Sequence, residues 1–224
     1  AYDAAKAATG DGNNCEAFVN PVNNEKVEWV SEAGKSKTVE ALPAGKYYLV
    51  EELAPAGYVK QINSADFEVK SDGTITKVEL KNEPTKVVIS KKDVTTGEEL
   101  PGAKIKICTL DSYEKDGSNC KPDKEEWSWT SGTEPNEIEA MPFGDYVLIE
   151  TLPAPDYEEG MIINGDLMTA YKFTLSEENY NVKIDVYNQV ITEVPKTGIS
   201  TLNLFAIGGL MVFVGYETIK IYIS

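Results

Sequence analysis

Short stretches of alternating apolar and polar residues recur along most of the chain. In Tyr146–Leu148 and Val182–Val186 every second residue is apolar, and Gly, Pro, Asn and Asp turns bound such segments. This period of two is typical of β-strands that bury one face. No stretch before residue 199 shows a sustained helical period. The pattern therefore predicts an all-β fold made of antiparallel β-sandwiches.

One long segment occurs twice. Residues 42–58, LPAGKYYLVEELAPAGY, match residues 141–157, MPFGDYVLIETLPAPDY, without a gap. Two such copies predict two tandem domains, over 1–84 and 85–190, each of about a hundred residues. The first copy lacks a counterpart of residues 87–108, so we expect it to be truncated at its N-terminus. In the second copy, Thr95-Thr96-Gly97 predicts a hairpin turn between the first two strands.

The composition excludes several classes of function. The chain has 37 acidic and 21 basic residues and a net charge of −16, which excludes a nucleic-acid-binding surface. It contains no histidine, so Ser-His-Asp or Cys-His catalysis and histidine-ligated zinc are also excluded. We expect no metal, no cofactor and no enzyme that turns over a substrate.

The three cysteines are too few for a disulfide scaffold. Cys108 and Cys120 flank a polar loop and can close it as a disulfide worth about 3 kcal/mol. The alternative is three free buried thiols. Cys15 follows Gly-Asn-Asn much as Cys120 follows Gly-Ser-Asn, so its partner is expected just before Ala1.

Three polar residues are in phase with the apolar face of their strands. They are Lys91, Glu150 and Asn188, on the first, a middle and the last strand of the second copy. A buried amine, carboxyl or amide is costly without a partner, so we expect the three to partner one another. In apolar surroundings the amine and the carboxyl can exchange a proton, which leaves a neutral, nucleophilic lysine. The product would be a Lys91–Asn188 isopeptide bond. On spacing alone, a simple buried ion pair or edge residues that reach solvent are the favoured interpretation.

The repeated segment resembles a known family. Tyr47-x-Leu49-x-Glu51 followed by Ala-Pro-x-Gly-Tyr resembles the E-box of Gram-positive pilins and of Cna B-type or SpaA-type adhesin domains, and residues 89–103 resemble their opening strand and hairpin. The resemblance implies tandem Ig-like or prealbumin-like sandwiches.

The same resemblance implies roles for the buried polar residues. It implies an isopeptide bond in which Lys91 is the nucleophile, Glu150 the catalytic carboxyl and Asn188 the acceptor. In the first copy Glu51 and Asn82 occupy the matching positions, and their lysine is expected ahead of residue 1.

Two departures from the family pattern matter. The second E-box has Asp156 in place of the usual Gly and its Ala-Pro is displaced by one position, which allows the loop after Glu150 to differ. The chain also lacks a pilin-type Tyr-Pro-Lys-Asn motif. We therefore expect an ancillary or basal pilin or a monomeric wall adhesin, with other pilins or peptidoglycan as partners.

The C-terminal region carries a predicted anchor. The uncharged run from Ile199 to Tyr216 is long enough for a membrane-spanning helix, which predicts a span and a short cytoplasmic tail over 199–224. The preceding linker, 191–198, contains a pentapeptide that resembles the sortase sorting signal Leu-Pro-x-Thr-Gly: Val194, Pro195, Lys196, Thr197 and Gly198. The resemblance implies sortase cleavage after Thr197, secretion and attachment to the cell wall. Only one basic residue follows the span, where the family has a cluster.

Two other classes of function remain open. A membrane-anchored module without an isopeptide bond would bind a glycan or host protein through Trp29, Trp127 and Trp129, although core packing is the favoured role for the last two. A secreted glycosidase would use paired carboxylates, but no pair here has a distinctive motif.

Overall fold

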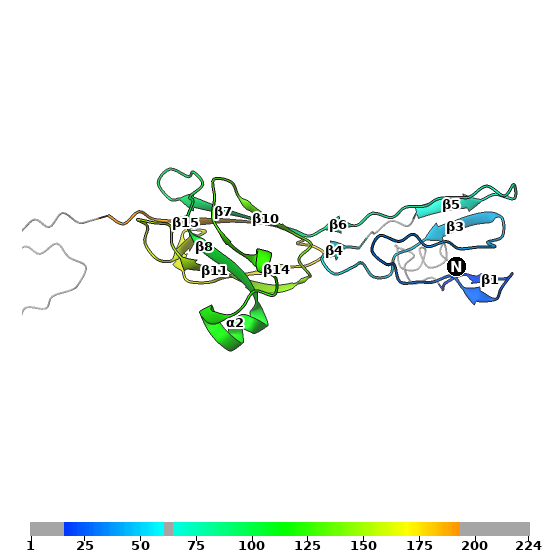
Figure 1. Cartoon of the computed structure of the whole chain (residues 1–224), viewed down its shortest axis with the longest axis horizontal. Helices are drawn as coiled ribbons and strands as arrows, with labels where there is room; N and C mark the ends of the chain where they lie inside the picture. Colours follow the sequence, from blue (N-terminus) through cyan, green and yellow to red (C-terminus); the bar gives the residue numbers. More distant parts are fainter. Residues whose placement is uncertain (1–15, 61–64, 193–224) are drawn as a thin grey trace, which may run out of the picture. The chain divides into compact units, whose positions relative to one another are not determined.

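The computed structural model describes residues 16–60 and 65–192 (Figure 1). Across these residues no helix is long and apolar enough to cross a membrane. The expected span over 199–224 and the sorting signal Val194–Gly198 lie outside the described residues.

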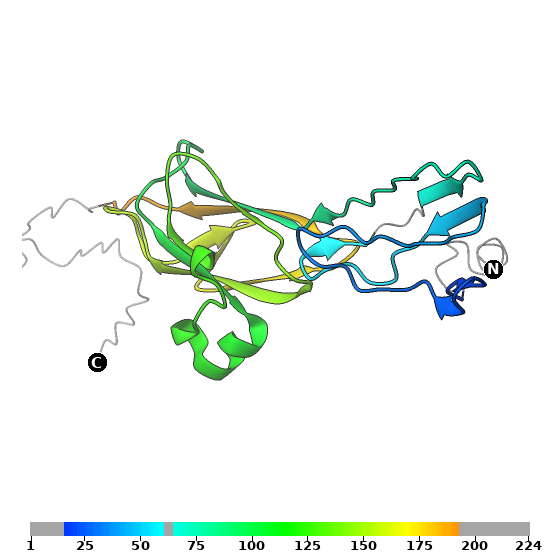
Figure 2. The same ribbon diagram turned by 45° about the vertical axis from the view of Figure 1, so that its right-hand side comes forward.

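The second copy of the repeat folds as two packed sheets (Figures 1 and 2). The five-stranded sheet has the order β10-β7-β15-β12-β13, and the four-stranded sheet has the order β14-β11-β8-β9. The strands of the first sheet are β7 (Lys86–Asp93), β10 (Asn136–Glu139), β12 (Met161–Ile163), β13 (Asp166–Met168) and β15 (Asn181–Asn188). Those of the second are β8 (Lys104–Thr109), β9 (Ser128–Thr130), β11 (Gly144–Leu152) and β14 (Tyr171–Leu175).

Alternate residues of both sheets fill the core between them. Most inward positions are apolar on the long strands, which confirms the predicted all-β sandwich; Lys91, Glu150 and Asn188 are polar exceptions. The buried members include Val87, Ile89, Ile105, Ile107, Tyr146, Leu148, Ile184 and Val186.

The sequence pattern predicts antiparallel sheets, but one pair of strands in the sandwich is parallel. β7 and β15 are hydrogen-bonded neighbours that run parallel, with Lys91 opposite Val186 and Asp93 opposite Asn188. Parallel neighbours need a long connection, and almost the whole domain lies between these two strands. The first and last strands of the domain are therefore adjacent.

The predicted hairpin between the first two strands is also wrong. A tight turn follows β7, in which Gly97 has φ 74° and its N–H donates to the carbonyl of Asp93 at 2.8 Å. After one bridge between Lys92 and Glu99, however, the chain leaves the sheet, and β8 belongs to the opposite sheet. The turn joins two layers of the sandwich.

A helical excursion follows β8, where the sequence pattern predicted only a polar loop. It contains α2 (Leu110–Asp116) and the short 3₁₀ helices η1 (Gly117–Asn119) and η2 (Glu125–Trp127). The Thr109 hydroxyl accepts from the Ser112 N–H at the start of α2, and Gly117 ends the helix at φ 56°. Seven residues are too few to produce a visible helical period, so only these caps mark the helix in the sequence.

The excursion covers the outer face of the four-stranded sheet (Figures 1 and 2). Cys108, Val147 and Ile149 point away from the main core and form a second buried cluster with Cys120, against which Leu110 and Tyr113 of α2 pack. This cluster explains why four consecutive residues of β11 are buried.

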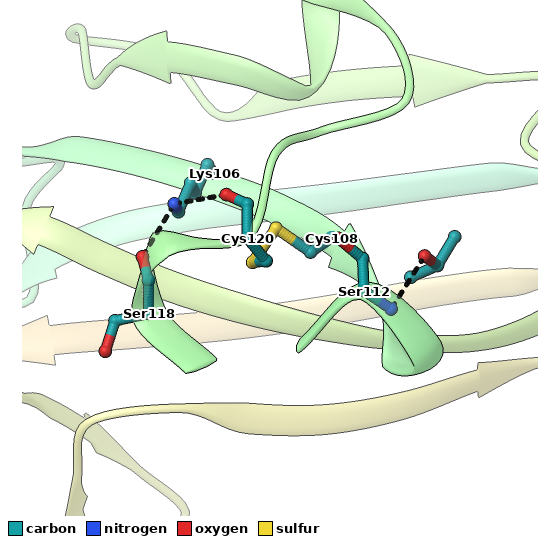
Figure 3. Close-up of a disulfide and its surroundings, with 6 residues drawn as sticks. Lys106, Cys108, Ser112, Ser118 and Cys120 are labelled. Atoms are coloured by element: carbon teal, nitrogen blue, oxygen red, sulfur yellow. Dashed lines mark hydrogen bonds between the residues drawn. A yellow bond between two sulfur atoms is a disulfide. The ribbon is translucent and has the colours of Figure 1, made fainter. Parts of the chain in front are cut away.

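The disulfide between Cys108 and Cys120 closes the excursion, with an S–S distance of 2.05 Å (Figure 3). Beside it, the Lys106 amine donates to the carbonyls of Ser118 at 2.8 Å and Cys120 at 2.6 Å. Burial lowers the pKa of this amine. Lys106 thus ties the far end of the loop back to β8.

The first copy repeats the central features of the second. Its strands are β1 (Val19–Asn20), β2 (Glu25–Lys26), β3 (Gly45–Leu49), β4 (Tyr58–Val59), β5 (Ala65–Val69) and β6 (Glu83–Pro84). β3 pairs with β5 in the register in which β11 pairs with β14. Tyr47 stacks on Phe67 at 5.5 Å and donates to the Pro43 carbonyl, as Tyr146 stacks on Phe173 at 5.6 Å and donates to the Pro142 carbonyl.

Candidate functional site

The structure brings Lys91, Glu150 and Asn188 together inside the second domain. Lys91 on β7 and Asn188 on β15 come from neighbouring strands of one sheet, and Glu150 comes from β11 of the opposite sheet. The side chains of Lys91 and Glu150 are each 2% exposed, and Asn188 is fully buried. The period of two explains the meeting, because each residue is in phase with the core positions of its strand.

The Glu150 carboxyl bridges the other two side chains. Its Oε1 lies 3.0 Å from the Lys91 Nζ, and its Oε2 accepts a hydrogen bond from the Asn188 Nδ2 at 3.0 Å. The contact with Lys91 is an ion pair that is not aligned as a hydrogen bond. One carboxyl group therefore contacts both nitrogens between which a proton would have to move.

Burial sets the protonation of the amine. Desolvation lowers the pKa of Lys91, and the neighbouring Glu150 carboxylate partly opposes this by favouring the charged form. A lysine with a lowered pKa loses its proton more readily than an exposed lysine, and the neutral amine is the nucleophilic form.

Backbone carbonyls fix the orientation of the Asn188 amide. Its Nδ2 donates to the carbonyl of Gly160 at 2.7 Å and approaches that of Glu158 at 3.5 Å. Since carbonyls only accept, the nitrogen and not the oxygen of the amide must face them. The Asn188 Oδ1 has no hydrogen-bond partner among the residues that the structure describes. The amide nitrogen is thus held between Glu150 and the loop after β11.

The first copy holds part of the same arrangement. The Asn82 Nδ2 donates to the Glu51 Oε1 at 2.7 Å. The lysine expected for this copy, ahead of residue 1, lies outside the described residues.

The altered E-box of the second copy keeps the turn of the first. The Tyr58 N–H donates to the Pro55 carbonyl at 3.0 Å, and the Tyr157 N–H donates to the Ala154 carbonyl at 3.1 Å. Asp156 has φ 72°, close to the 86° of its counterpart Gly57. The departures in sequence therefore leave this turn unchanged, although Asp156 occupies a backbone region that favours glycine.

Two of the three tryptophans pack in the core of the second domain. Trp127 is 2% exposed and packs edge-on against Tyr146 at 5.6 Å, and Trp129 packs against the same core. Trp29 in the first copy is 40% exposed. Across residues 16–60 and 65–192, no three His, Cys, Asp or Glu side chains gather as metal ligands would.

Sequence reasoning missed the contribution of the loop after β11. The carbonyls of Glu158 and Gly160 carry no signal in the sequence, because every residue has a backbone carbonyl. Tyr157, which contacts Asp93 at 2.5 Å, was visible as the last residue of the E-box, but its partner was not.

Comparisons with known proteins match most of the chain to one family of domains. The family model SpaA, described as a prealbumin-like fold domain, matches residues 11–84 and 85–190. A comparison with curated proteins finds no match.

Solved structures that are similar to this chain include pilus proteins. The Bacillus anthracis TIE protein is 26% identical over 67% of this chain and 26% of that one, with a TM-score of 0.38. The group B streptococcus pilus 2b backbone protein is 19% identical over 59% of this chain and 50% of that one, with a TM-score of 0.39. A streptococcal ancillary pilin is 21% identical over 66% and 43%, with a TM-score of 0.35. The chain thus spans between a quarter and a half of these proteins.

Proposed function

Because the chain belongs to the SpaA family of prealbumin-like fold domains, we propose that it is a structural protein of a Gram-positive cell surface whose second domain cross-links itself through Lys91 and Asn188. The observation that carries the proposal is the Glu150 carboxyl, which contacts the Lys91 nitrogen with one oxygen and the Asn188 nitrogen with the other. A simple ion pair does not require an amide nitrogen on the second oxygen.

The reaction exchanges one amide for another. The neutral Lys91 Nζ attacks the Asn188 Cγ, and a new C–N bond forms. Glu150 accepts a proton from Nζ and delivers a proton to Nδ2, so that the Cγ–Nδ2 bond breaks and ammonia leaves. The fold holds amine and amide together, which replaces an encounter in solution by an intramolecular step. The product stays in the domain, so the residues react once and do not turn over.

The cross-link suits a protein that bears load. It joins adjacent parallel strands at the beginning and end of the domain, so that tension between the domain's ends passes through a covalent bond. Without it, the hydrogen bonds of the β7–β15 ladder would carry the tension.

Intact mass measurement of the full chain tests the cross-link. We expect Lys91→Ala and Glu150→Ala to restore the mass of one ammonia relative to wild type, after correction for the substitution itself. Lys92→Ala is the matched control, because Lys92 is the next residue of β7 but pairs with Asp185 on the outer face at 2.9 Å. It should leave the ammonia deficit unchanged. A wild type that shows the full calculated mass, with no ammonia deficit, would contradict the proposal.

We also propose that sortase attaches the protein to peptidoglycan or to other pilins. Val194–Gly198 is the proposed signal and residues 199–224 are the proposed membrane span, supported by the sorting-signal resemblance and the apolar run that follows it. Cleavage would transfer the Thr197 carbonyl to an amine and release the fragment that begins at Gly198. Incubation with a sortase and a glycine-based amine should yield this product from wild type but not from Thr197→Ala. Full-length wild type after incubation would count against anchoring.

A further inference from the structure

The loop after β11 is tied closely to the end of β15. The Glu158 N–H donates to the Gln189 carbonyl at 2.8 Å, and Tyr157 forms a β-bridge with Val190. The same loop supplies the Glu158 and Gly160 carbonyls that face the Asn188 amide nitrogen. The position of this loop therefore sets the orientation of the Asn188 side-chain amide.

A side-chain hydrogen bond connects this loop to β7, the strand that carries Lys91. The Tyr157 hydroxyl donates to the Asp93 Oδ2 at 2.5 Å. Asp93 is the last residue of β7, stands two positions after Lys91 and lies directly opposite Asn188 in the parallel ladder. This hydrogen bond therefore reaches across β15, which carries Asn188. It joins the loop on one side of β15 to β7, which carries Lys91, on the other.

The aspartate is itself held in place. Its Oδ1 accepts from the N–H groups of Thr95 at 2.5 Å and Thr96 at 3.0 Å, so Oδ2 stays free to accept from Tyr157. Asp93 is 8% exposed. The hydrogen bond with Tyr157 lowers the pKa of Asp93 and raises that of Tyr157, so the aspartate stays ionised and the tyrosine protonated at neutral pH.

We propose that Tyr157 and Asp93 form a positioning pair for the cross-linking reaction. This inference rests on the proposed function, since it assigns a role in forming the Lys91–Asn188 bond. By joining the loop to β7, the pair keeps the Glu158 and Gly160 carbonyls against the amide nitrogen. The amide carbon is then presented to Lys91 and the leaving nitrogen to Glu150. Among the hydrogen bonds of the described residues, those of the Tyr157 and Asp93 side chains do not reach Lys91 Nζ, the Glu150 carboxyl or the Asn188 amide.

The test follows cross-linking in time. The full chain is made by cell-free synthesis with a short labelling pulse and quenched in acid at intervals, and the Lys91–Asn188 branched peptide is quantified after proteolysis. Tyr157→Phe keeps the ring but removes the hydroxyl. We expect its rate constant to fall by about 10-fold to 100-fold, as for a small misplacement of reacting groups. The measurement is made at a temperature where circular dichroism shows every variant folded.

Two further variants separate positioning from stability. Tyr146→Phe removes another tyrosine hydroxyl of this domain, the one that donates to the Pro142 carbonyl at 2.7 Å, and should cross-link at the wild-type rate. Asp93→Asn keeps a side-chain oxygen that accepts from the N–H groups of Thr95 and Thr96, and its amide N–H can donate to the Tyr157 hydroxyl oxygen. The link to Tyr157 is therefore retained, and the rate constant should stay within about threefold of wild type.

Each outcome decides the matter. A slow Tyr157→Phe beside fast Tyr146→Phe and Asp93→Asn supports the positioning pair. Equal rate constants for wild type and Tyr157→Phe overturn the positioning pair but leave the cross-link intact as a proposal. Equal slowing of Tyr157→Phe and Tyr146→Phe has the same consequence. If Tyr157→Phe does not fold, Asp93→Ala takes its place by removing the acceptor instead of the donor, and a wild-type rate for Asp93→Ala overturns the pair. A wild type that never forms the branched peptide overturns the proposed function itself.

Discussion

Replacing Lys91 and Glu150 together with apolar residues separates the covalent bond from the buried ion pair. The double variant Lys91→Met/Glu150→Leu removes nucleophile and carboxyl at once and leaves no unpaired buried charge. Replacing a buried ion pair by apolar groups of similar volume is often neutral or stabilising. Any large loss of stability in the double variant is therefore the contribution of the cross-link.

The size of that loss follows from the loop that the bond closes. Residues 91 and 188 delimit a loop of about a hundred residues, for which the chain-entropy model gives about 4 to 5 kcal/mol. For a domain of this size, such a change corresponds to a lowering of Tm by about 20 °C. The single variant Lys91→Met should lose about 3 to 5 kcal/mol more than the double variant, because it leaves the Glu150 carboxylate buried without its partner.

Thermal unfolding of the full-length variants, followed by circular dichroism beside intact mass measurement, gives both quantities. The variants that regain the ammonia mass should also be those with the lower Tm. A double variant that unfolds at the wild-type temperature, while wild type carries the ammonia deficit, would refute this expectation, since the bond would then have no effect on the unfolded chain.

Three further predictions concern the second domain. Cys108→Ala opens the disulfide loop and should lower the unfolding free energy by about 3 kcal/mol in denaturant titration, an effect that a reducing agent should reproduce in wild type. Asp156→Gly removes a side chain from a left-handed position and should raise that free energy by up to about 1 kcal/mol; a lower Tm would contradict this. Burial raises the pKa of Tyr146 from 10.0 to about 12. This tyrosine therefore ionises at lower pH in the unfolded chain than in the folded one, and the free energy of unfolding should fall as the pH rises from about 10 to about 12. Tyr146→Phe should flatten that part of a pH titration.

The location of the candidate site could be predicted because strand alternation is a strict rule. Once β7, β11 and β15 are recognised as strands, the phase of Lys91, Glu150 and Asn188 relative to their apolar neighbours places all three inside. Their burial then requires that they meet, since a lone buried charge is too costly. Alternation does not reveal which strands are adjacent or in which direction they run.

The parts that could not be predicted depend on backbone geometry. The parallel pairing of β7 with β15 is set by the path of the whole chain, and α2 is too short to show a period. The Glu158 and Gly160 carbonyls orient the Asn188 amide through a loop conformation that no residue type in the sequence indicates. The contact between Tyr157 and Asp93 likewise depends on how that loop folds over β15.

The two covalent links of the second domain would act on different properties. The disulfide at Cys108 and Cys120 closes a short loop on the outer face of the four-stranded sheet, and this whole loop lies between residues 91 and 188. Once Lys91 and Asn188 are joined, tension between the domain's ends passes from β7 to β15 and never reaches the disulfide. The disulfide would therefore add to the free energy of unfolding, whereas the proposed isopeptide bond would set how far the domain can extend under load. The proposed role as a surface stalk would require the second property, and a bond between Lys91 and Asn188 would provide it because β7 and β15 are adjacent and are the first and last strands of the domain.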